Sequence, residues 1–171
     1  MAVTSGTVYT NQNTSEGNTR FYVTWTQTSQ STTNNTTTIH WEIWFENHWE
    51  YYTNAVKINS LVIDGTTVYT EHTYSNLKYQ TVKLAEGDTT ITHGSDGKKT
   101  FSMTLTCWTY SSTTYTGTGS FELTQIMRGI ANWGVNGSWK PCMVYWGVNG
   151  TWKQCLVYYG VNGQWKQVGG S

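Results

Sequence analysis

The chain has 171 residues, which is enough for one ordinary domain with a small appendage. Lys and Arg together number 10, as do Asp and Glu, so no long-range field favours nucleic acid or an acidic membrane surface. The sequence also lacks an apolar run of about 20 residues, so we expect no membrane insertion. Aromatic residues make up 15% of the chain, and ten of them are tryptophan. Threonine is abundant as well. Aromatic and β-branched residues suit a pleated, half-buried surface, so this composition predicts an all-β protein.

Alternation of apolar and polar residues predicts two strands in the first third of the chain. Residues 19–28 and 36–45 each alternate with period two, which is typical of a strand with one buried face. The polar segment 29–35 between them is expected to be a loop. The residues assigned to the buried faces are Phe21, Val23, Trp25, Ile39, Trp41, Ile43 and Phe45.

Further strands follow at regular spacing. Residues 56–63 place Val56, Ile58 and either Leu61 or Ile63 inward. They lead into Asp64-Gly65, a pair that favours a hairpin turn because both turn positions must take positive φ. Tyr69, Tyr79, Val82 and Leu84 mark two more strands, and Asp96-Gly97 turns the chain into 100–108. There Phe101, Met103, Leu105 and Cys107 share a face, and 119–123 supplies a last strand. About eight short strands without a helical pattern predict an antiparallel β-sandwich over residues 1–128, either immunoglobulin-like or a jelly roll.

Three motifs in this region resemble those of siphovirus minor structural proteins associated with the tail. They are the hairpin Leu61 to Tyr69, the His-x-x-Asp-Gly sequence of His93 to Gly97 before a long strand, and Leu123 to Arg128. The last is similar to a Leu-x-x-Ile-Pro-Arg segment, with Met127 where proline is usual. The resemblance covers roughly residues 55–130. It implies a bacteriophage virion protein, assembled in the bacterial cytoplasm and extracellular after lysis, with other virion proteins as partners. The start of the chain shows no basic and apolar signal-peptide pattern, which fits that expectation.

His93 and Asp96 allow a structural and a functional interpretation. Asp favours turns for local hydrogen-bonding reasons, so Asp96-Gly97 is expected to form the turn, with His93 packed or hydrogen-bonded beside it. One His and one Asp fall short of a zinc ligand set, and the other histidines are scattered along the chain. We therefore predict a structural role and neither a metal nor a cofactor.

The C-terminal segment 129–171 repeats a 13-residue unit three times. Each unit places Asn-Gly between short aromatic strands, which predicts a type I′ hairpin. Because a single hairpin is marginal in water, stacked copies are expected to bury a continuous aromatic ridge. Such repeats look like short appendages at the ends of phage tail proteins. The turn pairs are Asn136-Gly137, Asn149-Gly150 and Asn162-Gly163.

The repeat register also places two of the three cysteines. Cys142 and Cys155 occupy equivalent positions, and Val168 takes that position in the third unit. A position that accepts Cys or Val is read as a small buried apolar site, although a Cys142–Cys155 bridge stays possible. With Cys107 the count is odd, which excludes a complete disulfide framework.

The repeat aromatics are candidate carbohydrate-binding residues, because tryptophan faces stack on sugar rings while nearby polar groups bond to hydroxyls. These residues are Trp133, Trp139, Trp146, Trp152, Tyr159 and Trp165. Packing is the alternative role. In the sandwich, alternation leaves Trp44 on the face opposite the core, where packing or a subunit interface is the preferred interpretation.

An enzyme is not expected. Glu42, Glu46 and Glu50 are four residues apart, which would align them on a helix, but their segment is strand-like. The nucleophile-elbow and phosphate-binding motifs are missing. The sequence thus predicts a virion structural protein that forms a homo-oligomer, as a tail or fibre component contacting host cell-wall saccharide. The alternative is a self-assembling subunit, such as a head decoration or an extracellular filament, that binds no ligand. A glycan hydrolase is the least favoured reading.

Overall fold

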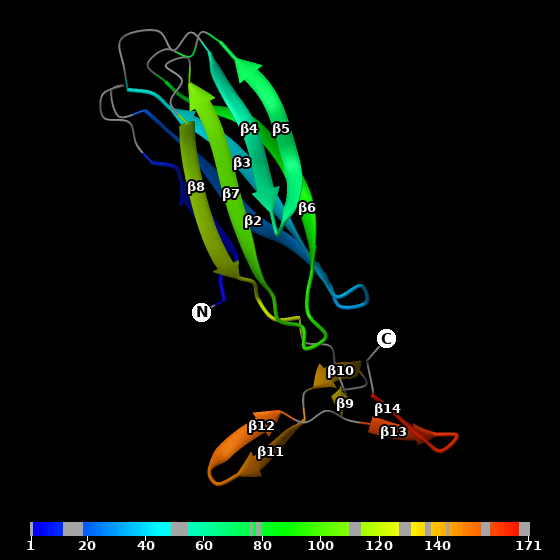
Figure 1. Cartoon of the computed structure of the whole chain (residues 1–171). Helices are drawn as coiled ribbons and strands as arrows, with labels where there is room; N and C mark the ends of the chain where they lie inside the picture. Colours follow the sequence, from blue (N-terminus) through cyan, green and yellow to red (C-terminus); the bar gives the residue numbers. More distant parts are fainter. Residues whose placement is uncertain are drawn as a thin grey trace.

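The protein is all-β in a computed structural model, as expected (Figure 1). The model describes residues 2–11, 19–48, 55–75, 77, 80–109, 114–126, 131–135, 138–142, 144–154 and 158–167. Within these ranges there is no helix long and apolar enough to cross a membrane.

Eight of the strands form two four-stranded antiparallel sheets packed face to face. The first sheet has the order β1 (Ser5–Tyr9), β2 (Arg20–Ser31), β3 (Thr36–Glu46) and β6 (Thr81–Thr92). The second has the order β5 (Thr66–Tyr74), β4 (Val56–Ile63), β7 (Thr100–Thr109) and β8 (Thr114–Glu122).

The strand order is immunoglobulin-like, a distinction that periodicity alone leaves open. Strands β3 and β6 are neighbours, and the β4–β5 hairpin between them in sequence lies in the other sheet. The order matches that of the immunoglobulin fold if β2, β3 and β6 correspond to its strands A, B and E, and β4, β7 and β8 correspond to its strands C, F and G. Strand β5 then extends the second sheet, and β1 adds an edge to the first.

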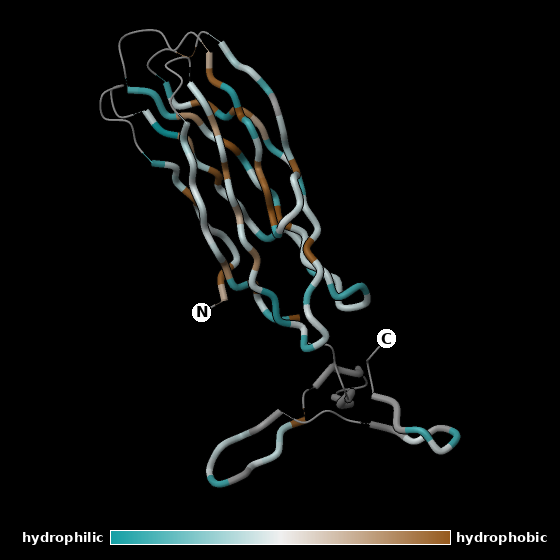
Figure 2. The backbone as a smooth tube through the Cα atoms, in the orientation of Figure 1, coloured by the Kyte–Doolittle hydropathy of each residue, from teal (hydrophilic) through white to brown (hydrophobic). Residues whose placement is uncertain are grey.

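The core lies between the sheets and consists of the alternating residues that the sequence indicates. Hydrophobic positions follow the sandwich strands, and hydrophilic ones gather at the turns (Figure 2). Leu61 and Ile63 are both buried, because a bulge between Ile58 and Ser60 shifts the alternation by one residue. The predicted inward residues that are buried are Phe21, Val23, Trp25, Ile39, Trp41, Ile43, Phe45, Val56, Ile58, Phe101, Met103, Leu105 and Cys107.

Two expectations about the strands need correction. The segment 29–35 is not all loop, since β2 continues to Ser31 beyond a bulge between Gln27 and Ser29, and the turn is limited to 32–35. Strand β1 was not predicted, because only Val8 in it is a buried apolar residue. Tyr79 lies outside the described residues.

One edge of the sandwich is closed by backbone bonds between the sheets. The Val3 N–H donates to the Glu122 carbonyl oxygen at 2.9 Å, and the Asn11 N–H donates to that of Thr116 at 3.4 Å. Strand β1 therefore ties the first sheet to β8 of the second.

The C-terminal segment contains three two-stranded hairpins, each a separate sheet. Figure 1 shows them beyond the end of the sandwich where β8 finishes. They pair β9 (Ala131–Val135) with β10 (Ser138–Cys142), β11 (Tyr145–Val148) with β12 (Thr151–Gln154), and β13 (Tyr158–Val161) with β14 (Gln164–Gln167).

Candidate functional site

The hairpin turns have the backbone geometry that a type I′ turn requires. Asn149 and Gly150 have φ of 50° and 77°, and Asn162 and Gly163 have φ of 51° and 77°. The Asp64-Gly65 turn of the sandwich matches them, with φ of 51° and 79°. Asn136 and Gly137 lie outside the described residues.

The second hairpin carries an exposed aromatic surface. Trp146 is 65% exposed and Trp152 is 74% exposed, with Tyr145 also exposed. The burial expected from stacked repeats is not seen for these three residues, and the described strands of each hairpin pair only within that hairpin. Trp146 and Trp152 belong to successive opposed pairs, so the register assigns them to opposite faces of the hairpin.

A glycine shapes this surface. Gly147 is opposite Trp152 in the strand register. A Cβ at Gly147 would meet three atoms of the Trp152 six-membered ring at 3.3–3.6 Å. The ring thus lies beside Gly147, where an added Cβ would touch it, and most of its surface faces solvent. An aromatic ring held in this way is suited to stacking against an apolar ligand face.

The other repeat aromatics occupy equivalent backbone positions. Trp139 is opposite Gly134 in the β9–β10 pair, and Trp165 is opposite Gly160 in the β13–β14 pair. Trp133 and Tyr159 take the position of Trp146 in their hairpins. The candidate binding residues are thus distributed over three hairpins.

His93 holds together the end of the sandwich from which the C-terminal segment leaves. Its side chain is buried, with Nδ1 at 2.8 Å from the Gly97 carbonyl oxygen and Nε2 at 2.7 Å from Thr37 Oγ1. A carbonyl oxygen only accepts, so Nδ1 donates, and in the neutral ring Nε2 accepts from the Thr37 hydroxyl. Asn35 Nδ2 donates to the carbonyl oxygens of His93 and Gly94, which joins the β2–β3 turn to the same loop.

The motif at 93–97 also fixes the closing segment of the sandwich. The Ile126 N–H donates to the Gly97 carbonyl oxygen at 2.9 Å, and Gln125 Nε2 donates to the Asp96 carbonyl oxygen at 2.8 Å. Gly97 has φ of 73°, and a Cβ there would lie 2.0 Å from the Ile126 carbonyl oxygen. Asp96 Oδ1 accepts from the Lys98 N–H, as a turn aspartate does. Hydrogen bonds thus join His93, Asp96 and Gly97 to the β2–β3 end of the sheet and to the closing segment.

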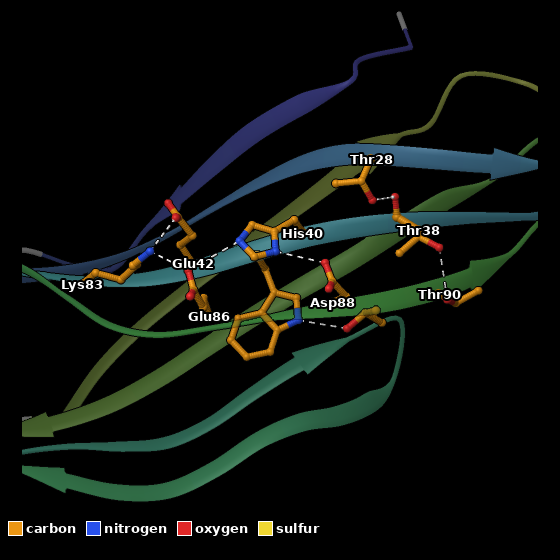
Figure 3. A network of polar contacts seen from close by, with 10 residues as sticks. Thr28, Thr38, His40, Glu42, Lys83, Glu86, Asp88 and Thr90 are labelled. Carbon is orange, nitrogen blue, oxygen red and sulfur yellow. Dashed lines mark hydrogen bonds and ion pairs between the residues drawn. The ribbon is translucent and has the colours of Figure 1, made fainter.

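A polar network covers the outer face of β3 and β6 (Figure 3). Lys83 Nζ lies 3.1 Å from Glu42 Oε1 and 2.5 Å from Glu86 Oε2. His40 Nδ1 lies 3.0 Å from Asp88 Oδ1, and its Nε2 is 3.7 Å from Glu86 Oε2. Donor atoms of His40, Glu42 and Glu86 are close enough together to hold a cation. The ammonium of Lys83 already partners both glutamates, so a surface ion-pair network accounts for the cluster. Lys83 and Asp88 were missed at the sequence level, because contacts between strands far apart in sequence are invisible there.

Glu42 and Glu46 of β3 each accept a hydrogen bond from a cationic side chain. A hydrogen bond from Lys83 lowers the pKa of the Glu42 carboxyl, and one from Arg20 lowers that of Glu46. A glycosidase general acid needs a raised pKa instead. Glu50 lies outside the described residues.

An aromatic row crosses the same outer face. Tyr9, Tyr22 and Trp44 are consecutive in the register of β1, β2 and β3. The rings of Tyr22 and Trp44 are parallel within 4°, with centroids 6.2 Å apart, and the Arg20 guanidinium lies 4.6 Å from the Tyr9 ring centroid. Trp44 therefore lies outside the core, as alternation indicates, and it packs in a row of cross-strand pairs.

The described cysteine, Cys107, is buried in β7 with a free thiol, and its burial raises the pKa of that thiol. The expectations for Cys142 and Cys155 concern side chains that lie outside the described set.

Comparison with known proteins identifies the family. Residues 8–137 match the model of the siphovirus protein of unknown function (DUF859). A search of curated proteins finds no match. Among solved structures, the chain is similar to one assigned to the ApaA protein of Bordetella pertussis, with 16% identity over 63% of this chain and 93% of that one, at a TM-score of 0.34. A Northeast Structural Genomics Consortium target, SoR45, shows 15% identity over 64% of this chain and 89% of that chain, also at a TM-score of 0.34. The family match spans the sandwich and reaches the first hairpin, so the chain belongs to the siphovirus proteins of unknown function (DUF859).

Proposed function

We propose that this siphovirus protein is a structural component of the virion tail or fibre, and that its C-terminal hairpins contact host surface carbohydrate. The observation that carries the proposal is the exposure of Trp146 and Trp152 on one hairpin, with the Trp152 ring beside Gly147. Tryptophan ring faces stack on the C–H faces of sugars, and amide and hydroxyl side chains bond to the sugar hydroxyls. Asn149 and Thr151 lie beside these rings in sequence.

The sandwich serves as the rigid support of this contact surface. Several of its polar side chains make structural bonds, with His93 bound to Thr37 and Gly97 and with Lys83 bound to two glutamates. We propose binding without catalysis, and in support of it the pKa values of Glu42 and Glu46 are lowered, whereas a glycosidase general acid needs a raised pKa.

The test is a pull-down of the full chain on purified Gram-positive cell-wall polysaccharides. The double variant Trp139→Ala/Trp152→Ala is expected to lose binding, and Trp44→Ala is the control for an aromatic on the sandwich face. Retained binding in the double variant, or loss in Trp44→Ala alone, would move the contact surface away from the hairpins. Labelling of purified virions with an antibody to the chain tests the tail location, and signal on the head alone would refute it.

A self-assembling subunit without a ligand is the second candidate, and the same exposed tryptophans favour it. Large exposed aromatic surface is covered between copies in many assemblies, and a net charge near zero gives little repulsion against association. Light scattering separates the two. A stable oligomer that the double tryptophan variant disrupts, together with no polysaccharide binding, would favour assembly.

A further inference from the structure

The three hairpins share a two-faced arrangement that the strand register makes explicit. Directly opposed residues of an antiparallel pair lie on the same face, and successive residues alternate between faces. One face of each hairpin therefore holds a Gly–Trp pair, and the other holds an aromatic residue opposite a lysine. The Gly–Trp pairs are Gly134 with Trp139, Gly147 with Trp152 and Gly160 with Trp165, and the aromatic–lysine pairs are Trp133 with Lys140, Trp146 with Lys153 and Tyr159 with Lys166.

Charge is divided unevenly between the two parts of the chain. All ten acidic residues lie within 1–128, together with seven of the ten basic ones. The segment 129–171 contains three lysines and no acidic residue, while the chain as a whole is neutral. The hairpin segment is thus a cationic appendage on an anionic sandwich, and its lysines are spaced one per repeat.

We infer that the hairpins recognise an anionic saccharide, a sugar polymer that bears phosphate or carboxylate groups, with one weak subsite on each hairpin. This inference rests on the proposed function and specifies its ligand class. On the face opposite the Gly–Trp pair, the aromatic residue supplies the stacking surface for the sugar, as the exposed Trp146 does in the second hairpin, and the lysine opposite it in the register supplies the charge for the anion. Three weak subsites on one chain raise the overall affinity, because the second and third contacts form at high effective concentration.

Single-stranded nucleic acid is the other polymer that combines stacking surfaces with negative charge. The sugar polymer fits better, because nucleic acid carries a charge on every nucleotide and its grooves are strongly basic, whereas each hairpin offers one lysine. Apart from these lysines, the polar residues next to the rings in sequence include amides and hydroxyls, which match sugar hydroxyls.

The experiment measures binding of the full chain to the wall polysaccharides before and after their anionic groups are removed. Dephosphorylation with hydrofluoric acid removes phosphate, and carbodiimide amidation blocks carboxylates. Comparing the two treatments shows which anionic group the chain recognises. The expected result is a loss of tenfold or more in affinity in one arm. The triple variant Lys140→Gln/Lys153→Gln/Lys166→Gln is expected to bind the untreated polymer as weakly as the wild type binds the treated one. The triple Lys→Arg variant keeps the charge and is expected to retain binding. Lys98→Gln on the sandwich is the matched control and is expected to change nothing.

Several outcomes would overturn the inference. Equal binding to treated and untreated polymer would show that the anionic groups do not contribute to binding. The proposed contact with saccharide would remain intact. If inorganic polyphosphate binds as tightly as the polysaccharide, the chain recognises charge alone. If single-stranded DNA binds as tightly, the chain recognises a different polymer. No binding to any wall polysaccharide would contradict both the inference and the proposed function.

Discussion

The sandwich and the hairpins use tryptophan in opposite ways. Trp25 is 1% exposed and packs edge-on against Phe101 and Phe121 between the two sheets. Trp152 lies beside a glycine within its own hairpin and is 74% exposed. In the sandwich an aromatic ring stabilises the fold through residues far away in sequence. In the hairpin its contact is local, and its surface remains available to a ligand.

The largest expected effect tests this contrast directly. Trp25→Ala removes a buried indole from the core and is expected to lower the free energy of unfolding by about 3–5 kcal/mol. Trp152→Ala removes an exposed indole and is expected to change it by less than about 0.5 kcal/mol. Urea unfolding followed by far-UV circular dichroism measures both, since fluorescence would change with the tryptophan itself. A similar cost for the two variants would show that the hairpin ring is part of the sandwich fold.

A second pair of variants separates backbone strain from packing. Gly97→Ala combines an unfavourable positive φ with a clash against the Ile126 carbonyl oxygen, and we expect a loss of about 3 kcal/mol. Gly65→Ala has a similar φ with no atom within 4 Å of the added Cβ, so about 1 kcal/mol is expected. Thermal unfolding of the two variants checks the difference. Equal losses would mean that the closing segment moves aside from the 93–97 loop at little cost.

The bond between His93 and Thr37 is expected to contribute less. Thr37→Val preserves shape but leaves His93 Nε2 buried without its hydroxyl partner, at a cost of about 1–2 kcal/mol. Thr38→Val, one residue along on the outer face, is expected to be close to neutral. Urea unfolding of both variants provides the test. If Thr37→Val leaves the free energy of unfolding unchanged, the hydrogen bond between Thr37 and His93 does not stabilise this end of the sandwich.

The smallest effect concerns pH and the sandwich surface. Arg20 Nε lies 2.6 Å from Glu46 Oε2 and lowers the pKa of that carboxyl below its ordinary 4.5. A carboxyl with a lowered folded-state pKa stabilises the fold above its unfolded pKa, and this stabilisation is lost as pH falls through the folded value. Glu46→Gln is therefore expected to cost about 1 kcal/mol or less at pH 7, with the difference from wild type vanishing in acid. Unfolding measured from pH 7 to pH 2 provides the test. Arg20→Gln should abolish the same pH dependence, and its persistence would assign it to another partner such as His48.

Alternation in the sequence predicts most of the sandwich core, because residues such as Ile39, Trp41 and Ile43 lie on long strands with one buried face. Strand β1 escapes prediction, since Gly6 occupies an inward position where the Trp25 and Phe121 rings fill the space that a side chain would take. Strand β6 is ambiguous for a different reason. Its buried residues Leu84 and Ile91 do not follow a single period-two alternation, because a bulge near Ile43 and Trp44 shifts the register.

The candidate site is predictable only in part. The Asn-Gly pairs indicate the hairpins and their turns, because the φ requirement is local to two residues. Whether the hairpins stack depends on contacts between repeats, about which the spacing of 13 residues carries no information. The Lys83 network and the Asn35 contact to the 93–97 loop join strands that are 41 and 58 residues apart, respectively, in sequence.

The attachment of Ile126 to Gly97 has a mechanical consequence. If the hairpins hold a bacterial surface, tension along the chain enters the sandwich at Ile126 and next at Leu123, whose N–H donates to the Lys99 carbonyl oxygen. These two hydrogen bonds would carry the pulling force. The buried His93 side chain is hydrogen-bonded within the loop that accepts them. A pulling force would then break a few hydrogen bonds at one loop and lengthen the connection to the hairpins before it loads the hydrophobic core between the sheets.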